Sequence, residues 1–436
     1  MFGCVLEEYN SNQSSRNVYS KKEDNTLSVV EKETKDDTSL KNVFMTVFLP
    51  EGYPDSVSDD YFDYQFWDTL QAFASSVTNT LATHAILKGI GVGDSTATPI
   101  AATITWLMRD GTGMLGRIAF AYLQGSKLDA DCKKWRLFAD IINDVSIGID
   151  IITPYFAGFT TLLQCFSSLG RSLVGITGSA TRAALTQHQA RRNNLADVSA
   201  KDGSQETVVN LIALIFSLTV IPIILLSTNL IWITFIGFTL FHIYANYSAV
   251  RAVSMEIVNF DRFAILVEEY LKSGIVQSVK EVNSKENVLP LVWSEYSKYP
   301  CKIGVSIQEH VKDYTDLMAL RNCNNGCSYL LSLNHSETVP IKISLNEKED
   351  SLTILEAAFQ AILIHFCRTN KTAFDAFISD IIEKYSSYDS YQIISKTRKF
   401  TEVNFPIFVS KAIAEGWDFS RNLLLVDGWR IKTHLF

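Results

Sequence analysis

The sequence predicts a mainly α-helical protein in which a polytopic membrane bundle of about six helices precedes a small α+β domain. Residues 208–226 and 230–245 carry no charged side chain, and each segment approaches the roughly 20 apolar residues that cross a bilayer. Four further apolar segments precede them. Beyond Arg262 the chain becomes more polar, with mixed helix and strand patterns. These three observations predict the fold class.

The two most apolar segments are separated only by Ser227, Thr228 and Asn229. Backbone groups in lipid must find hydrogen-bond partners within the protein, so two such helices joined by a polar turn form a hairpin. A buried hairpin of a soluble protein is the alternative, but such helices usually show a polar stripe. We therefore expect this hairpin to insert into a membrane.

The first 47 residues are rich in Ser, Lys, Glu and Asp and poor in aromatic residues. This composition buries little apolar surface and predicts a disordered polar tail. The tail shows neither the apolar stretch of a secretory signal nor the Arg-rich bias of a transit peptide. We divide the chain into this tail (residues 1–47), a helical membrane domain (48–262), and a third part (263–436). The third part comprises an amphipathic helix and the α+β domain.

The four weaker apolar segments cover residues 64–87, 99–123, 138–166 and 169–186. All are rich in Gly, Ala, Ser and Thr, and small residues let helices approach closely inside a membrane. We expect all four to cross, which gives six spans. The alternative is a single membrane hairpin attached to a peripheral helical domain, because soluble helical cores also use Ala.

Basic residues are distributed unequally over the connections of such a bundle. If the N-terminus lies inside, the outer connections contain only Lys88 and Arg171. This positive-inside asymmetry predicts that both termini and the C-terminal domain are cytosolic. The inner basic residues are Lys127, Lys133, Lys134, Arg136, Arg191, Arg192, Lys201, Arg251 and Arg262.

The last third of the chain alternates between strand and helix patterns. Residues 263–279 predict an amphipathic helix, and residues 352–366 and 372–385 predict two more helices. Short strands are expected where apolar residues alternate or cluster between turn residues. These strands are residues 302–307, 329–333 and 341–345, with a final strand pair at 423–432.

Charged residues interrupt the weaker segments. Arg109, Asp110 and Arg117 lie in the second segment, and Asp140 and Asp144 lie one turn apart in the third. Ionisable groups at membrane depth normally face the bundle interior and pair, so we expect Arg109 or Arg117 to pair with Asp140 or Asp144. Functionally, this polar core would bind a small charged solute. Structurally, it is an ion-pair lock or a set of interfacial charges, which is the interpretation that we favour.

A dense polar stretch precedes the hairpin. Adjacent arginines with an asparagine pair suit a phosphate or carboxylate through forked hydrogen bonds. The same residues suit anionic lipid headgroups, or a basic loop that fixes topology. The candidate anion or lipid contacts are Arg182, Arg191, Arg192, Asn193, Asn194 and Lys201.

Several functions are disfavoured. A net charge of −8 without a basic stripe argues against nucleic-acid binding. Residues 111–116 (GTGMLG) fit a dinucleotide pattern, but no strand precedes them, so we interpret them as a closely packed helix. Cys323 and Cys327 have no second Cys/His pair at ligand spacing. The sequence also contains no catalytic triad, so we expect no metal, no cofactor and no enzymatic activity.

Eight stretches together resemble the root UVB-sensitive (RUS) family, and its animal members in particular. The resemblance extends from about residue 48 to residue 274, over half of the chain. The stretches are residues 49–55 (LPEGYPD), 60–73 (DYFDYQFWDTLQAF), 81–83 (LAT), 89–94 (GIGVGD), 109–116 (RDGTGMLG), 135–140 (WRLFAD), 180–184 (ATRAA) and 189–205 (QARRNNLADVSAKDGSQ).

The resemblance implies a membrane-associated protein without an assigned activity or catalytic residues. Plant members are linked to vitamin B6 homeostasis and act as complexes of paralogues, which implies a homo- or hetero-oligomer. We therefore expect a non-enzymatic, multi-pass membrane protein that contacts lipids and binds or moves a small anionic solute. The alternative is a membrane-anchored scaffold that recruits a partner through its C-terminal domain. A pyridoxal phosphate Schiff base on Lys88, Lys127 or Lys201 is disfavoured, since no cofactor-binding fold surrounds them.

Overall fold

The structure is a computed structural model that describes residues 4–9, 15–21, 27–34, 45–92, 98–290, 301–324, 328–336, 338–370 and 372–432. It is mainly helical and contains a few short strands. The chain forms two compact units. Unit 1 comprises Met1–Gly125 and Trp135–Val253, and unit 2 comprises Ser126–Lys134 and Ser254–Phe436.

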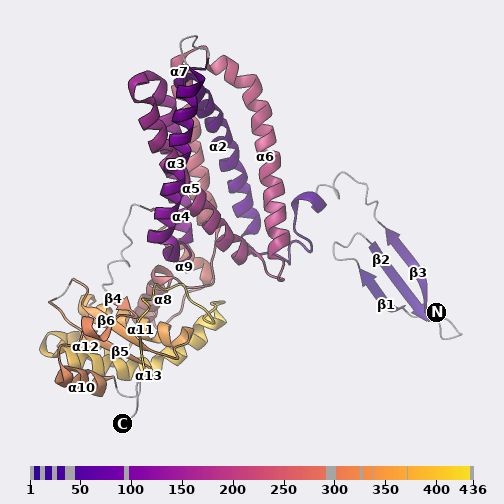
Figure 1. Cartoon of the computed structure of the whole chain (residues 1–436). Helices are drawn as coiled ribbons and strands as arrows, with labels where there is room; N and C mark the ends of the chain where they lie inside the picture. The colour runs from indigo at the N-terminus through magenta and orange to yellow at the C-terminus, as the bar shows by residue number, and fades with distance from the viewer. Residues whose placement is uncertain are drawn as a thin grey trace. The chain divides into compact units, whose positions relative to one another are not determined.

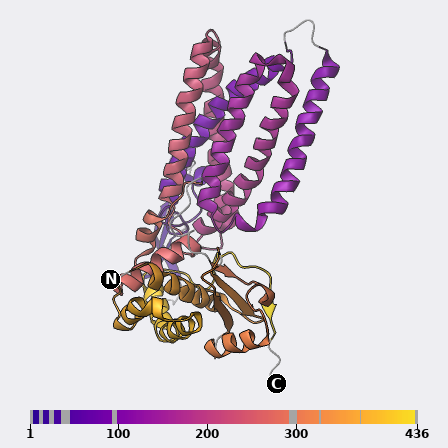
Figure 2. The same cartoon turned by 90° about the vertical axis from the view of Figure 1, so that its left-hand side faces the viewer.

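The helices of unit 1 run alongside one another in a bundle (Figures 1 and 2). Each apolar segment of the sequence lies within one of them, with one change of boundary described below. They are α2 (Tyr61–Gly89), α3 (Pro99–Gln124), α4 (Cys132–Ile152), α5 (Thr160–Gln189), α6 (Leu195–Ile224) and α7 (Thr228–Ala252).

The boundary between the third and fourth predicted segments was wrong. Helix α4 ends at Ile152, and two short 3-10 turns follow at Thr153–Tyr155 and Ala157–Phe159. Pro154 lies in this break, where its missing N–H and fixed φ end the α-helical ladder. Helix α5 then runs unbroken from Thr160, so Arg171 lies within a helix and not in a connection.

Small residues bring α3 against α5. A Cβ atom built on Gly113 would lie 2.7 Å from Ser168 Oγ, and one built on Gly116 would lie 2.6 Å from Ser172 Oγ. The Ser168 hydroxyl also donates to the carbonyl of Arg109 at 2.7 Å. The glycine pattern of residues 111–116 therefore serves helix packing, in agreement with our interpretation of the sequence.

The bundle has apolar side chains on its surface and polar side chains in its interior. Leu115 on α3 is 71% exposed and Leu218 on α6 is 69% exposed, whereas His242 on α7 is fully buried. Soluble proteins show the opposite distribution. Other exposed apolar residues are Ile100, Leu107, Ile118, Leu211, Ile215, Ile233, Ile236 and Leu240. Other buried polar residues are Gln71, Thr78, Asp144, Asp150, Gln164, Ser217 and Asn246.

Part of the predicted N-terminal tail is a three-stranded antiparallel sheet. Strands β1 (Cys4–Tyr9), β2 (Ser15–Lys21) and β3 (Leu27–Thr34) pair in sequence order. The structure thus has strands where the sequence predicted disorder. Neighbouring strands satisfy one another's backbone groups without a large apolar core, which a prediction based on composition overlooks.

Unit 2 combines a small mixed sheet with helices. Strand β6 (Ile341–Asn346) is central and pairs in parallel with β4 (Cys301–Ile303) and β7 (Arg430–Ile431), and antiparallel with β5 (Tyr329–Leu333). The helices are α8 (Phe260–Ser273), α9 (Val279–Lys285), α10 (Tyr314–Cys323), α11 (Ser351–Thr369), α12 (Ala376–Lys384) and α13 (Ser390–Ala414).

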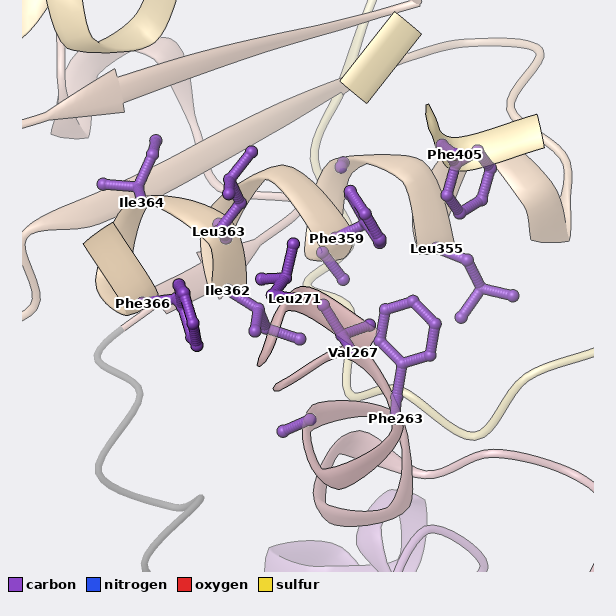
Figure 3. Packing of buried hydrophobic residues seen from close by; sticks show 14 of the residues in the cluster. Phe263, Val267, Leu271, Leu355, Phe359, Ile362, Leu363, Ile364, Phe366 and Phe405 are labelled. Atoms are coloured by element: carbon purple, nitrogen blue, oxygen red, sulfur yellow. The ribbon is translucent and has the colours of Figure 1, made fainter. Parts of the chain in front are cut away.

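Helix α11 forms the centre of the core of unit 2 (Figure 3). Phe359 of α11 contacts Phe405 of α13, with ring centroids 5.6 Å apart. Phe263 and Tyr270 of α8 contact Phe408 of α13 at 6.0 and 5.2 Å. Aromatic pairs at these distances add to the free energy of apolar burial.

Helix α8 belongs to this core, and the longer segment of unit 2 begins at Ser254, nine residues before the predicted third part. The predicted amphipathic helix ends early, at Ser273, because Gly274 adopts φ +74° and caps α8. Helices α9, α10 and α13 were not predicted. Nor was it predicted that Ser126–Lys134 belongs to unit 2.

Candidate functional site

A buried His–Asp pair lies inside the bundle of unit 1. His242 Nδ1 on α7 lies 2.8 Å from Asp144 Oδ2 on α4, and His242 Nε2 lies 3.0 Å from Gln71 Oε1 on α2. The exposed fractions of these three residues are 0%, 4% and 7%. Three helices that are distant in sequence thus converge on one imidazole.

The network continues from Gln71 along α2 and α4. Gln71 Nε2 donates to Asp68 Oδ1 at 3.1 Å, and Arg136 donates to the same oxygen at 2.9 Å. Arg136 Nε also lies 3.8 Å from Asp140 Oδ2, one turn further along α4. Direct contacts therefore link Arg136 to His242 through Asp68 and Gln71.

Three further ion pairs lie in the same bundle. Arg182 of α5 binds Asp202 and Glu206 of α6 at 2.5 and 2.7 Å, and Gln65 of α2 donates to Asp202 at 3.2 Å. Elsewhere, Arg171 of α5 donates to the fully buried Asp150 of α4 at 2.6 Å. Every arginine named in these contacts is paired with a carboxylate.

Some buried polar atoms of the bundle make no hydrogen bond to the described residues. They include Asp140 Oδ2, Asp144 Oδ1, and both amide atoms of Asn246, which is 1% exposed. Asn246 lies one turn after His242 on α7, and Asp140 lies one turn before Asp144 on α4. Buried polar atoms that could form hydrogen bonds to a bound species therefore lie beside the His–Asp pair.

The predicted polar core was partly wrong. Asp140 and Asp144 do lie in the interior network, but their partners are Arg136 and His242. The other predicted members lie on α3, which packs against α5. There Arg109 covers the Trp106 ring at 4.8 Å, and Asp110 and Arg117 are exposed. The partners of Asp140 and Asp144 thus come from α4 itself and from α7, which sequence spacing could not reveal.

The predicted anion-binding stretch mostly makes contacts within the protein. The backbone N–H of Arg191 and the Asn194 side chain both donate to the carbonyl of Ser56 at 3.1 Å, and Lys201 donates to the carbonyl of Thr46. Asn193 adopts φ +54° in this turn. Arg182 is paired as described above, and Arg192 remains 58% exposed, 3.7 Å from Asp55. Arg191 and Arg192 are thus the exposed arginines of this set.

Sequence reasoning missed Arg136, Asp68 and Gln71. The available signal was spacing: Asp68 and Gln71 lie on one face of α2, and Arg136, Asp140 and Asp144 recur every fourth residue on α4. The sequence pattern places Arg136 in a basic connection, and therefore does not align it with Asp140 and Asp144 on the same helix face.

Unit 2 has its own buried ionic cluster. Glu286 accepts hydrogen bonds from Lys133 at 2.9 Å and from Arg262 at 2.7 Å, and Lys133 also donates to Asn283 at 2.7 Å. Burial raises the pKa of Glu286, but the positive charges of Arg262 and Lys133 outweigh it and lower this pKa to about 2. The cluster joins Lys133 to α8 and α9 and has the geometry of a structural lock.

The described residues contain no group of three or more His, Cys, Asp or Glu side chains arranged to hold a metal ion. Cys323 ends α10, whereas Cys327 lies outside the described residues. Among the described helices, α6, α7 and α11 are long and apolar enough to cross a membrane, with mean hydropathies of 2.4, 1.4 and 1.2. Of these, α11 is the core helix of unit 2.

Sequence comparison assigns the family. Residues 34–274 match the family described as "Vitamin B6 photo-protection and homoeostasis domain", and residues 275–433 match "Root UVB sensitive protein, C-terminal". The chain therefore belongs to the root UVB-sensitive family, as its sequence motifs indicated.

Relatives occur in a slime mould and a plant. RUS family member 1 of Dictyostelium discoideum is 44% identical over 315 residues, which cover 70% of this chain and 58% of the relative. Protein root UVB sensitive 3 of Arabidopsis thaliana is 44% identical over 247 residues, which cover 57% of this chain and 56% of the relative. The chain thus matches little more than half the length of these relatives. No solved structure matches it.

Proposed function

We propose that this chain is a multi-pass membrane protein whose helical bundle binds and moves a small polar solute in vitamin B6 homoeostasis. The observation that carries the proposal is the distribution of side chains in α2–α7. Large apolar residues face outward, and a connected ionisable network lies inside. Apolar surfaces of this extent are stable against lipid, and intramembrane ionisable residues commonly line solute or ion pathways.

The pairing of the interior charges indicates the class of solute. Arg136, Arg171 and Arg182 are each bound to carboxylates in the described bundle. An anionic solute would have to displace one of those carboxylates. A neutral or cationic solute with several hydrogen-bonding groups meets no such cost. We therefore replace the anionic solute expected from the sequence by an unphosphorylated B6 vitamer, such as pyridoxine or pyridoxamine.

Calorimetric titration of the purified protein in lipid nanodiscs tests this proposal. Pyridoxine, pyridoxamine and pyridoxal 5′-phosphate serve as ligands, and Asp140→Asn serves as the interior variant. Loss of the Asp140 charge beside Arg136 should weaken vitamer binding at least tenfold. The matched control is Asp110→Asn, which changes an exposed carboxylate of α3 and should leave affinity unchanged.

Three results would contradict the proposal. Absence of binding by the wild type would remove the solute function altogether. Equal losses in Asp140→Asn and Asp110→Asn would exclude the interior network as the site. Stronger binding of pyridoxal 5′-phosphate than of pyridoxine would restore the anionic alternative. In that case, a phosphate would replace a carboxylate on Arg136 or Arg182.

A scaffold function is the second candidate, supported by an apolar stripe on α13. Val403, Ile407 and Ile413 are 65%, 46% and 58% exposed in unit 2. A second chain of the family would cover these residues, in line with the homo- or hetero-oligomer expected from the resemblance. Ile407→Asp should then convert an oligomer to a monomer in size-exclusion chromatography with light scattering. An unchanged mass would exclude this stripe as the contact.

A further inference from the structure

We infer that His242 is the proton-binding site of the bundle and that its imidazole carries two protons in the state described here. The location of this proton follows from hydrogen-bond directions in the interior network. Its use in solute movement rests on the proposed function. The proton is the second, small ligand of the same interior site.

The first ring nitrogen faces a carboxylate. Asp144 Oδ2 lies 2.8 Å from Nδ1, and an ionised carboxylate only accepts hydrogen bonds. With Asp144 ionised, Nδ1 carries a proton and donates it to the carboxylate. This contact alone is compatible with a neutral imidazole, so the second nitrogen determines the charge.

The second ring nitrogen faces an amide oxygen. Gln71 Oε1 lies 3.0 Å from Nε2, and this oxygen also only accepts. The orientation of the amide is fixed at its other end, where Gln71 Nε2 donates to Asp68 Oδ1. A flipped amide would place its oxygen against the Asp68 carboxylate. Nε2 of His242 therefore also carries a proton, and the ring is an imidazolium.

The surrounding charges are consistent with a positive ring. Helix α4 contributes Asp144, Asp140 and Arg136 around His242, and α2 contributes Asp68 through Gln71. Residues 207–224 of α6 carry no charge, and α7 itself contributes the uncharged Asn246 one turn away. Carboxylates thus outnumber the single arginine in this environment.

Loss of one proton would change the contacts of α2. After deprotonation of His242 Nε2, the lone pair of this nitrogen faces Gln71 Oε1 and the two atoms repel each other. A flip of the Gln71 side-chain amide relieves this repulsion. The turned amide then directs its oxygen at Asp68 and breaks the hydrogen bond of 3.1 Å. Proton release at His242 is therefore coupled to the contact between Gln71 and Asp68, next to Arg136. This coupling is what a proton-linked solute site requires.

Nitrogen-15 NMR of histidine-labelled protein in nanodiscs tests the site directly. The chain has seven histidines, and His242 is assigned by the signal that disappears in His242→Gln. We expect two protonated ring nitrogens on His242 at pH 7. A single protonated nitrogen on His242 at pH 7 would overturn the inference.

Asp144→Asn provides the variant test, because it removes the charge that holds the second proton but retains a side chain of the same shape. The His242 ring should then become neutral at pH 7. Asp110→Asn is the control and should leave both protons in place. Two protons on His242 in Asp144→Asn would contradict the role of the pair.

Liposome measurements separate the proton site from the proposed function. Vitamer uptake should acidify a pH-dye-loaded lumen in the wild type, and His242→Gln should abolish this acidification, whereas Asp110→Asn should retain it. Uptake without acidification would exclude proton coupling but retain the solute function. Absence of vitamer uptake would contradict the proposed function, and the NMR result would still decide the protonation of His242.

Discussion

At the scale of single residues, Glu286 shows how a buried charge is stabilised in unit 2. It lies between Arg262 and Lys133, and all three side chains are at most 3% exposed. Removing one member of such a set leaves an uncompensated buried charge, which costs about 3–5 kcal/mol. The cluster therefore makes unit 2 sensitive both to substitution and to pH.

Glu286→Gln should destabilise unit 2 by about 3–5 kcal/mol at pH 7. Urea unfolding, followed by pulsed hydrogen exchange in α8 and α9, measures this effect. Glu268→Gln is the control, because Glu268 lies in a more exposed pair with Lys272 at 3.4 Å and should change stability by about 0.5 kcal/mol or less. Similar losses in both variants would contradict the structural role of the cluster.

The same residue predicts a pH dependence. Burial raises the pKa of Glu286, but Arg262 and Lys133 lower it to about 2 from an ordinary value of 4.5. A lowered pKa contributes stability that is fully present above pH 4.5 and is lost as the pH falls toward 2. Wild-type unit 2 should thus lose stability between pH 4.5 and 2, and Glu286→Gln should lose less. The free energy of unfolding in urea should be measured for both proteins at pH 7 and pH 3. Equal decreases for the wild type and Glu286→Gln would contradict this expectation.

Residue-level prediction from the sequence found Asp140 and Asp144 because charges interrupt an apolar segment. It could not find their partners. His242 is 98 residues from Asp144 and 171 from Gln71, and the pairing depends on which helices are neighbours. Arg109 and Arg117 were closer in sequence and equally plausible by charge. The glycine face of α3 packs against α5, and the two carboxylates instead contact Arg136 and His242.

At the scale of elements, the packing of α3 against α5 depends on the absence of side chains. Gly116→Ala should lower the stability of the bundle by about 1–3 kcal/mol, because the new methyl group meets Ser172 Oγ at 2.6 Å. Gly111→Ala on the same helix has no atom within 4 Å, and should stabilise α3 slightly through helix propensity. Thermal unfolding of the two variants in detergent compares them. Equal Tm values would exclude close packing at Gly116.

The presence of the helices in the bundle could be predicted well, because the length of an apolar segment is a strong signal. Boundaries were less predictable. The expected span of residues 138–166 ignored Pro154, which ends α4, and an expected break before residue 169 does not occur. In unit 2, α13 was missed because Pro406 interrupts its pattern, although the helix runs from Ser390 to Ala414.

At the scale of the whole molecule, the division into units defines which fragments can fold. Helix α8 supplies Phe263 and Tyr270 to the core of unit 2, so a fragment of residues 301–436 lacks part of that core. We expect residues 254–436 to unfold cooperatively, at reduced stability because Lys133 is absent from this fragment, and residues 301–436 to remain unfolded, as measured by circular dichroism during heating. Cooperative unfolding of the shorter fragment would contradict the assignment of α8. Tests of partner binding should accordingly use the longer fragment.

Membrane topology is the property of the whole chain on which the proposed function depends most. Helices α6 and α7 are joined by a short turn that ends at Ser227, and their apolar side chains face outward. If the hairpin spans a membrane and the basic connections lie inside, the tip is lumenal and unit 2 is cytosolic. Unit 2 contains the native glycosylation acceptors Asn334-His335-Ser336 and Asn370-Lys371-Thr372, of which the exposed Asn334 reports on this unit. Asn246 cannot report, because it is buried within α7.

Expression with microsomes should therefore add a glycan to an acceptor placed in a lengthened tip at Thr228, and none to Asn334. Endoglycosidase-sensitive mass measures both sites in one experiment. Glycosylation of Asn334 alone would invert the orientation, so that unit 2 and the exposed Arg192 would face the lumen. Absence of a glycan at both sites would mean that the hairpin does not cross. The apolar surface of α6 and α7 would then have to be covered by protein, and the scaffold function would replace the solute pathway.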